Sequence, residues 1–269
     1  MMNTEKMKVH FTDNSLINAT NPIQVNVFGA GGTGSKVLTA LIEMEHSLIE
    51  LGHAGLSVRL WDDDIITEAN LGRQRFAACE IGLYKSVALI NRFNRWEGTN
   101  WKAETVKFGK DHLGKLPEYA PASIYISCVD SVQARFEIAG ILKALRNGRN
   151  YGNEPKYWLD FGNSQHTGQV ILSTIGNIRQ PQSEKYETVA SLPFVTDEFG
   201  DLLKHSEATD DTPSCSLAEA LEKQDLYINS SLAQMGCSLL WGLFRNGFTQ
   251  YRGFFHNLKD FNTHPIKVA

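Results

Sequence analysis

Cysteine is scarce in this sequence and is nowhere clustered. The four cysteines are far apart and include no Cys-x-x-Cys pair: Cys79, Cys128, Cys215 and Cys237. This spacing indicates neither a disulfide framework nor a tetrahedral zinc site, so no structural zinc is expected. A functional cysteine would have to act alone.

Long apolar runs and an excess of positive charge are also missing. Residues 1–23 lack a signal-peptide core, and no later stretch approaches the roughly 20 apolar residues of a membrane span. We therefore expect a cytoplasmic protein with no membrane partner. The 30 acidic and 26 basic residues give a formal net charge of -4, which argues against nucleic acid as a partner.

Apolar residues are plentiful, at 42% of the 269 residues, and can form a substantial core. Residues 23–28 alternate apolar and polar side chains and predict a strand, while residues 33–51 have the apolar spacing of a helix. Further strands are predicted at 57–61, 103–108, 123–129, 157–161 and 169–174, and further helices at 85–96, 132–145 and 216–244. The alternation predicts an α/β fold with a Rossmann-like, doubly wound, mostly parallel sheet and helices on both faces.

The second half of the chain has a different pattern. Residues 176–214 are polar and show no sustained period, which predicts a long loop of the kind usually reserved for function. Residues 251–268 predict one or two closing strands, which would give the sheet an antiparallel C-terminal extension.

A glycine loop joins the first predicted strand to the helix that follows it. Gly29, Gly31, Gly32 and Gly34 lie within the sequence Gly-Ala-Gly-Gly-Thr-Gly. Such a loop lets the backbone approach a phosphate, which the free N–H groups and dipole of the helix then stabilise. Asp62 ends the second predicted strand, where a carboxylate can hold ribose hydroxyls. These features predict a nucleotide site but do not distinguish NAD from ATP.

Two later segments favour a triphosphate. Asn70-Leu71-Gly72-Arg73-Gln74 and Gly82-Leu83-Tyr84-Lys85 bring cations to the nucleotide end of the sheet. Attack at an α-phosphate needs charge spread over many oxygens, which Arg, Lys and a metal ion supply. Asp130 follows a buried strand and is suited to hold magnesium. Taken singly, Arg73 and Lys85 are also explained as solvated surface charges.

These motifs together resemble the E1-like superfamily, the family of ThiF, MoeB and the ubiquitin-activating enzymes, and in particular its bacterial ThiF-type proteins. The matching motifs span about 23–170: Gly29-x-Gly31-Gly32-x-Gly34, Asp62-x-Asp64, Asn70-Leu71-x-Arg73-Gln74, Gly82-x-x-Lys85 and Asp130. The resemblance implies ATP-dependent adenylation of the C-terminal carboxylate of a ubiquitin-like or sulfur-carrier protein of the β-grasp type. It also implies a homodimer and a single adenylation domain over 1–269, with a nucleotide-binding half at 1–150 and a partner-binding half with the crossover loop at 151–269.

By the same resemblance, each motif residue has an implied role. Asp62 would hold the ribose, Asn70, Arg73 and Lys85 the phosphates, and Asp130 the magnesium ion; the glycines, Asp64 and Gln74 complete the ATP site. One departure concerns the N-terminus. Simple homodimeric members supply an arginine from an N-terminal helix to their neighbour, yet no arginine precedes Arg59 here. Either Lys6, Lys8 or His10 takes its place or the dimer differs.

Cys215 lies in the sequence Thr-Pro-Ser-Cys-Ser, just before a predicted helix. A helix N-terminus favours a thiolate, and the segment is similar to the Pro-x-Cys-Thr site of thioester-forming relatives. The alternative is an inert cysteine at a helix start. Two other functions also stay open: an NAD-dependent oxidoreductase and a non-catalytic E1-like scaffold.

Overall fold

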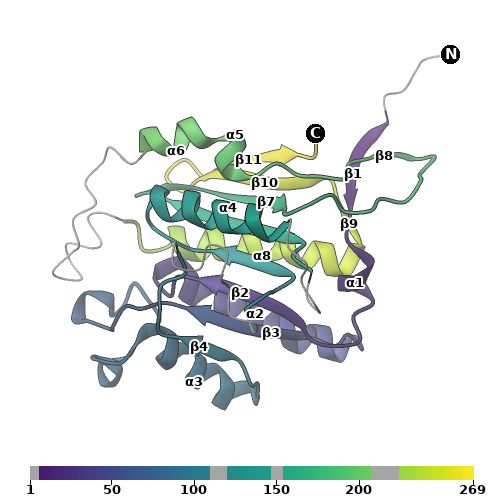
Figure 1. Cartoon of the computed structure of the whole chain (residues 1–269). Coiled ribbons are helices and arrows are strands. Elements are labelled where there is room, and N and C mark those ends of the chain that lie inside the picture. Colours follow the sequence, from purple (N-terminus) through teal and green to yellow (C-terminus); the bar gives the residue numbers. More distant parts are fainter. Residues whose placement is uncertain (1–5, 110–119, 147–153, 207–223) are drawn as a thin grey trace.

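The computed structural model describes residues 6–109, 120–146, 154–206 and 224–269, and an eight-stranded sheet forms its centre (Figure 1). In sheet order, the strands are β11 (Asn262–Lys267), β10 (Tyr251–Asn257), β7 (Thr167–Thr174), β6 (Tyr157–Asn163), β5 (Ile124–Ser127), β2 (Ile23–Phe28), β3 (Leu56–Trp61) and β4 (Lys102–Glu104). The five strands from β6 to β4 are mutually parallel, and β7, β10 and β11 continue the sheet as antiparallel strands.

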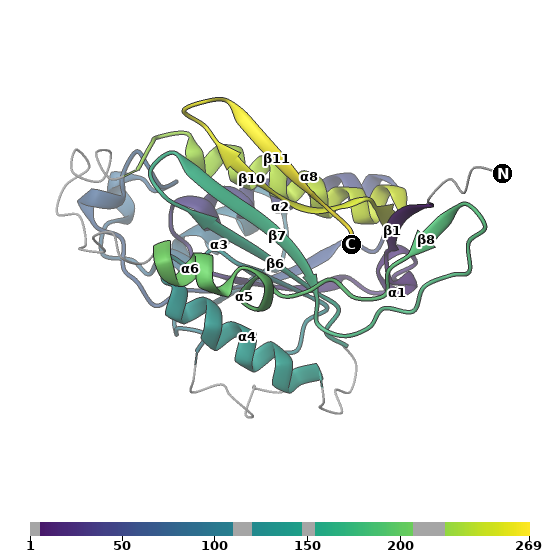
Figure 2. The ribbon, with the colours of Figure 1, turned by 90° about the horizontal axis from the view of Figure 1, so that it is seen from above.

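Helices cover both faces of this sheet (Figure 2). One face carries α2 (Gly32–Glu50), α3 (Lys85–Glu97) and α8 (Ile228–Asn246), whose apolar residues join one buried cluster. The other carries α4 (Val132–Arg146), α5 (Val195–Glu198) and α6 (Gly200–Ser206), which contribute to a second cluster around Trp61 and Trp158. None of the helices within the described ranges is long and apolar enough to cross a membrane.

Glycines end two of these helices for a simple reason. Gly98 follows α3 with φ +69° and Gly247 follows α8 with φ +72°. This left-handed conformation lets the last helical carbonyls be satisfied, and glycine adopts it without steric cost.

A small second sheet holds the N-terminal strand. β1 (Met7–Phe11) pairs in parallel with β8 (Tyr186–Thr188) and antiparallel with β9 (Phe248–Thr249). The chain then enters the short helix α1 (Asn14–Ile17) before β2.

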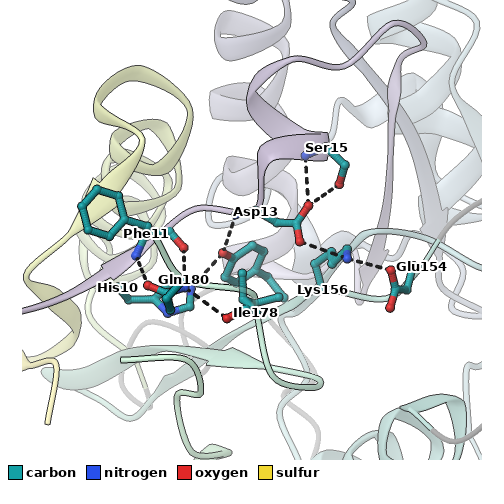
Figure 3. A network of polar contacts seen from close by, with 9 residues as sticks. His10, Phe11, Asp13, Ser15, Glu154, Lys156, Ile178 and Gln180 are labelled. Atoms are coloured by element: carbon teal, nitrogen blue, oxygen red, sulfur yellow. Dashed lines mark hydrogen bonds and ion pairs between the residues drawn. The ribbon is translucent and has the colours of Figure 1, made fainter. Parts of the chain in front are cut away.

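Polar contacts fix this N-terminal segment to the main sheet (Figure 3). The side chain of Gln180 accepts a hydrogen bond from the backbone N–H of Phe11 at 2.8 Å and donates one to its carbonyl at 3.0 Å. Lys156, just before β6, forms ion pairs with Asp13 at 3.0 Å and Glu154 at 2.7 Å. The segment therefore packs at the amino ends of the parallel strands.

The predicted fold class is confirmed, including the antiparallel C-terminal extension. Several details differ from the predictions. The helix predicted at 216–244 begins at Ile228 as α8, and the described residues 224–227 lie outside it. The last parallel strand ends at Glu104, β1 was not predicted, and the stretch predicted as a long loop contains β8, α5 and α6. These added elements, β1, β8, α5 and α6, are only 5, 3, 4 and 7 residues long, too short to show a sustained apolar pattern, and β1 and β8 pair with each other across a long stretch of sequence.

Candidate functional site

The register of the parallel strands brings three loops to one edge of the sheet. Phe28 of β2 is paired with Trp61 of β3 on one side and with Ser127 of β5 on the other. The residues that follow, Gly29, Asp62 and Cys128, therefore leave the sheet side by side at its carboxyl edge. The chain turns to opposite sides of β2 at this point, which is where ligands bind in doubly wound sheets.

The glycine loop is packed tightly against the loop after β5. Gly29 has φ +92°, and a Cβ there would lie 2.7 Å from the carbonyl oxygen of Cys128. A Cβ on Gly34 would lie only 1.9 Å from the carbonyl oxygen of Gly29. Gly31 differs, because a Cβ there would meet no atom within 4 Å. Gly29 and Gly34 are thus required by the fold, whereas Gly31 leaves open space in front of α2.

This difference gives a prediction for two matched variants. Gly34→Ala should lower the free energy of unfolding by about 2–4 kcal/mol, because the loop must move to admit the methyl group. Gly31→Ala should change stability by less than about 1 kcal/mol and weaken binding of a phosphate ligand, because its methyl fills the space where the ligand would approach. Chemical denaturation and ligand titration check both effects. Equal destabilisation by the two variants would contradict this assignment of the glycines.

Asp62 links the glycine loop to the end of β3. Its Oδ2 accepts a hydrogen bond from the N–H of Ala30 at 2.6 Å, and its Oδ1 accepts one from the N–H of Asp64 at 3.0 Å. Burial raises the pKa of Asp62 to about 6, against the opposing effect of these amides and of Lys85. The carboxylate is therefore mostly ionised at neutral pH and keeps free lone pairs for a hydroxyl donor.

Lys85 and Asn70 have partners within the protein. Lys85 Nζ forms an ion pair with Asp64 at 2.6 Å, with the lysine side chain 9% exposed and the aspartate 65%. Asn70 Oδ1 accepts from the N–H of Thr67 at 2.8 Å, which caps the short helix η1 (Glu68–Asn70). Lys85 would have to exchange Asp64 for a phosphate, while the Asn70 side-chain N–H groups are left to donate.

A second cation, which the sequence reasoning did not single out, lies beside Arg73. Lys36 projects from the first turns of α2 and donates to the carbonyl oxygen of Arg73 at 2.7 Å. Burial, together with the nearby positive charges of Arg75 and Arg73, lowers the pKa of Lys36 to about 8. These three cations repel one another, so an anion bound beside them would be stabilised. The signal in the sequence was a lysine four residues after Gly32.

The start of α8 closes this side of the site. Asn229 is 1% exposed; its Oδ1 accepts from the Thr33 hydroxyl at 2.7 Å and its Nδ2 donates to Gln224 Oε1 at 2.8 Å. A Cβ on Gly32 would lie 2.5 Å from Asn229 Nδ2. The extra glycine of the Gly31-Gly32 pair therefore makes room for Asn229. Gln74 is buried beside Arg73 in the sequence, and its Oε1 has no hydrogen-bond partner among the described residues.

Asp130 follows β5, on the side of β2 opposite to β3 and Asp62. It is exposed, and no hydrogen bond or ion pair involves its carboxylate within the described ranges. In the part of the chain that the structure describes, no three His, Cys, Asp or Glu side chains gather to hold a metal. A single free carboxylate beside a phosphate site nevertheless fits Mg²⁺, which is commonly held by one or two carboxylates together with substrate phosphates and water.

A buried ion pair contacts the loop that carries Asp130. Arg135 of α4 and Asp160 of β6 lie 3.2 Å apart, with side chains 5% and 1% exposed. Arg135 also donates to the carbonyl oxygen of Val129 at 2.6 Å, and Ser127 donates to Asp160 at 2.5 Å. Burial raises the pKa of Asp160 despite the attraction of Arg135. Arg135 therefore holds the residue next to Asp130 in place.

The N-terminal candidates do not reach this site. His10 is fully buried; its ring contacts the Val189 carbonyl oxygen at 2.6 Å and the Tyr157 hydroxyl at 2.9 Å, and burial lowers its pKa. Its partner Tyr157 is the first residue of β6, so His10 lies at the amino end of that strand, whereas the glycine loop follows the carboxyl end of β2. Lys8 is on β1 and pairs with Glu187 at 3.8 Å. A buried neutral ring offers no cation, so His10 is poorly suited to replace the missing arginine. Because that arginine serves the neighbouring subunit in the family, what takes its place here stays a prediction.

The cysteines divide by burial. Cys215 lies outside the described residues, so its role stays a prediction. Cys237 is buried in α8, and burial raises its pKa to about 12. Burial also raises the pKa of Cys128, whereas Cys79 is exposed. Cys128 and Cys237 are thus poor thiolates.

Comparisons with known proteins agree with this arrangement. E. coli MccB has a TM-score of 0.58 at 13% identity, covering 94% of this chain and 63% of that chain. MccB solved with AMPCPP and MccA gives 0.57 at 14%, covering 94% and 65%, and PaaA gives 0.57 at 15%, covering 91% and 64%. This chain thus spans less than two thirds of the length of these structures. No curated protein gave a significant match.

At such identities the structures share a fold and no more, and that fold with the glycine loop at the switch point defines a protein of the Rossmann type. The model of the ThiF family matches residues 5–267. The chain therefore belongs to the ThiF family.

Proposed function

We propose that this protein is an ATP-dependent enzyme that adenylates a carboxylate, using the loop after β2 as its nucleotide site. The observation that carries the proposal is the convergence of two cations, Lys36 and Arg73, on the glycine loop at the start of α2. The free carboxylate of Asp130 emerges from the neighbouring strand. MccB, which has the same fold, has been solved with ATP and with AMPCPP together with MccA.

The geometry suits in-line attack at an α-phosphorus. A carboxylate oxygen of the partner forms the new P–O bond, the bond to the β-phosphate oxygen breaks, and pyrophosphate leaves with the electron pair. The α2 N–H groups, Arg73 and Lys36 would stabilise the charge on the phosphate oxygens, and Lys85 would join them on leaving Asp64. Mg²⁺ bound at Asp130 would supply further charge to these oxygens. Asp62 would hold the ribose.

The substrate we propose is the C-terminal carboxylate of a ubiquitin-like or sulfur-carrier protein of the β-grasp type, activated by the whole chain acting as one adenylation domain, in a homodimer. The cognate carrier should therefore stimulate exchange between ATP and pyrophosphate.

If Cys215 captures the adenylate, a reductant-sensitive adduct should form and be lost in Cys215→Ala, while exchange survives. Exchange without an adduct would mean that the adenylate passes directly to an acceptor. Light scattering on the same sample reports the dimer.

Nucleotide titration tests the first step. At pH 7, ATP with Mg²⁺ should bind in the micromolar range and NAD should not compete. Because the uncharged form of Lys36 gains population as the pH rises through about 8, ATP affinity should fall several-fold between pH 7 and pH 9. Isothermal calorimetry measures both effects. Tight NAD binding without ATP binding would favour the oxidoreductase, and ATP binding without any exchange would favour a scaffold.

A further inference from the structure

Gln224 makes a contact with Arg73 that the proposed chemistry does not yet use. Its Oε1 accepts a hydrogen bond from Arg73 Nη1 at 2.6 Å and a second from Asn229 Nδ2 at 2.8 Å. Asn229 is in turn bound to Thr33 in the glycine loop. A chain of hydrogen bonds through the uncharged side chains of Gln224, Asn229 and Thr33 therefore joins the Arg73 guanidinium to the start of α2.

Gln224, the side-chain hydrogen-bond partner of Arg73, is uncharged, so it leaves the positive charge of Arg73 available to bind an anion. Within the described ranges no carboxylate forms an ion pair with Arg73, and its Nε is buried without a hydrogen-bond partner. Burial accordingly lowers the pKa of Arg73. An amide oxygen fixes the direction of a guanidinium but leaves its full positive charge available, whereas a carboxylate would neutralise it.

Hydrogen bonds of the neighbouring Asp225 fix the backbone segment that carries Gln224. The N–H of Asp225 donates to the carbonyl oxygen of Gln165, in the turn between β6 and β7, at 2.9 Å. The side chain of Asp225 then accepts from the N–H of Tyr227 at 2.8 Å. Gln224 is thus anchored to the β6–β7 turn through Asp225 and to the start of α8 through Asn229. Such anchoring lets Gln224 set the direction of the Arg73 side chain.

We propose that Gln224 is a positioning residue for nucleotide phosphate: it directs the Arg73 guanidinium at the glycine loop and, being neutral, preserves its charge for the ligand. This inference rests on the proposed function, since it needs a phosphate ligand at the loop. Gln224 also lies nine residues after Cys215 in the sequence. It therefore provides a direct contact between the chain that follows Cys215 and the proposed phosphate site.

Two variants separate positioning from simple support of the fold. Gln224→Glu keeps the acceptor oxygen but adds a charge that pairs with Arg73, so ATP affinity should fall about 10-fold or more while thermal stability stays equal or rises. Gln224→Leu removes the acceptor, so ATP affinity should fall about 3-fold to 10-fold. Binding of adenosine, which has no phosphate, should stay within about twofold in both variants. Gln234→Glu, an exposed change of the same charge on α8, is the matched control and should alter neither ligand.

Calorimetric titration of each variant with ATP and with adenosine gives distinct results. Wild-type affinity for ATP in Gln224→Glu, or an equal loss of ATP and adenosine binding, would overturn the role of Gln224 and leave the proposed function intact. A wild-type protein that binds adenosine but gains nothing from the phosphates, or binds neither ligand, would instead overturn the proposed function and this inference with it.

Discussion

Replacing Arg135 with methionine is expected to lower the free energy of unfolding by about 3–5 kcal/mol, because it removes one partner of a buried ion pair. The substitution leaves Asp160 buried without its cation, at 1% side-chain exposure. Loss of the guanidinium should raise the Asp160 pKa further, so the variant can protonate the carboxyl at acidic pH and bury it neutral. The destabilisation should therefore be smaller at pH 5 than at pH 8. Urea denaturation at the two pH values measures it.

A double variant tests whether the unpaired charge of Asp160 causes the loss of stability. Arg135→Met with Asp160→Asn removes both charges and keeps an acceptor for Ser127, so more than half of the lost stability should return. Arg135→Met should also lower the enzymatic activity, because the Val129 carbonyl oxygen loses the hydrogen bond from Arg135 that fixes the residue next to Asp130. The double variant still lacks this hydrogen bond, so it should not regain the activity. Equal losses in the single and double variants would refute the ion-pair explanation.

The parts of this fold that were predicted from sequence depend on local patterns. Helix α3 begins at the predicted residue, Lys85, and α2 lies within one residue of its predicted bounds, because apolar periodicity and flanking glycines define both. The glycine loop was found for the same reason, since all of its residues are adjacent in the chain. The motif does not contain the reason for Gly32, which makes room for Asn229 almost 200 residues away, or for Gly29, which packs against the carbonyl oxygen of Cys128.

The contacts that were not predicted depend on packing between distant elements. Helices α2 and α8 lie side by side on one face of the sheet, and only this packing brings Asn229 and Gln224 to the phosphate side of the loop (Figure 2). Arg135 and Asp160 left a readable signal, a charged residue within an apolar helix face and another within the apolar run of β6. Two charges on neighbouring buried elements indicate an ion pair, because neither is stable there alone.

The resulting site divides its charges between two walls. Lys36, Arg73 and the helix N-terminus meet on the α2 side, and the carboxylates Asp62 and Asp130 stand at the ends of β3 and β5, with Lys85 paired to Asp64 near Asp62. A ligand with phosphates at one end and hydroxyls at the other matches this division, and Asp130 would hold a metal ion that adds positive charge near the phosphates. The separation supports a nucleoside triphosphate over a nicotinamide dinucleotide, whose single pyrophosphate needs fewer cations.

Replacing Asp130 with asparagine is expected to reduce metal-dependent turnover at least about 100-fold while leaving the fold intact. The side chain is exposed and makes no hydrogen bond within the described ranges, so its loss should change the free energy of unfolding by less than about 0.5 kcal/mol. The amide keeps the size of the carboxylate but binds Mg²⁺ more weakly. ATP–pyrophosphate exchange, measured against Mg²⁺ concentration, should show a higher metal requirement as well as a lower rate.

Asp63→Asn is the matched control, because Asp63 is another exposed aspartate at the same edge of the sheet. It should exchange at the wild-type rate with the wild-type dependence on Mg²⁺. ATP binding measured without metal should be the same in both variants and in the wild-type protein, since the cations and amides of the α2 wall are unchanged. A fast Asp130→Asn enzyme with an unaltered Mg²⁺ dependence would show that the ion is held elsewhere, and loss of metal-free ATP binding would show that Asp130 shapes the nucleotide site itself.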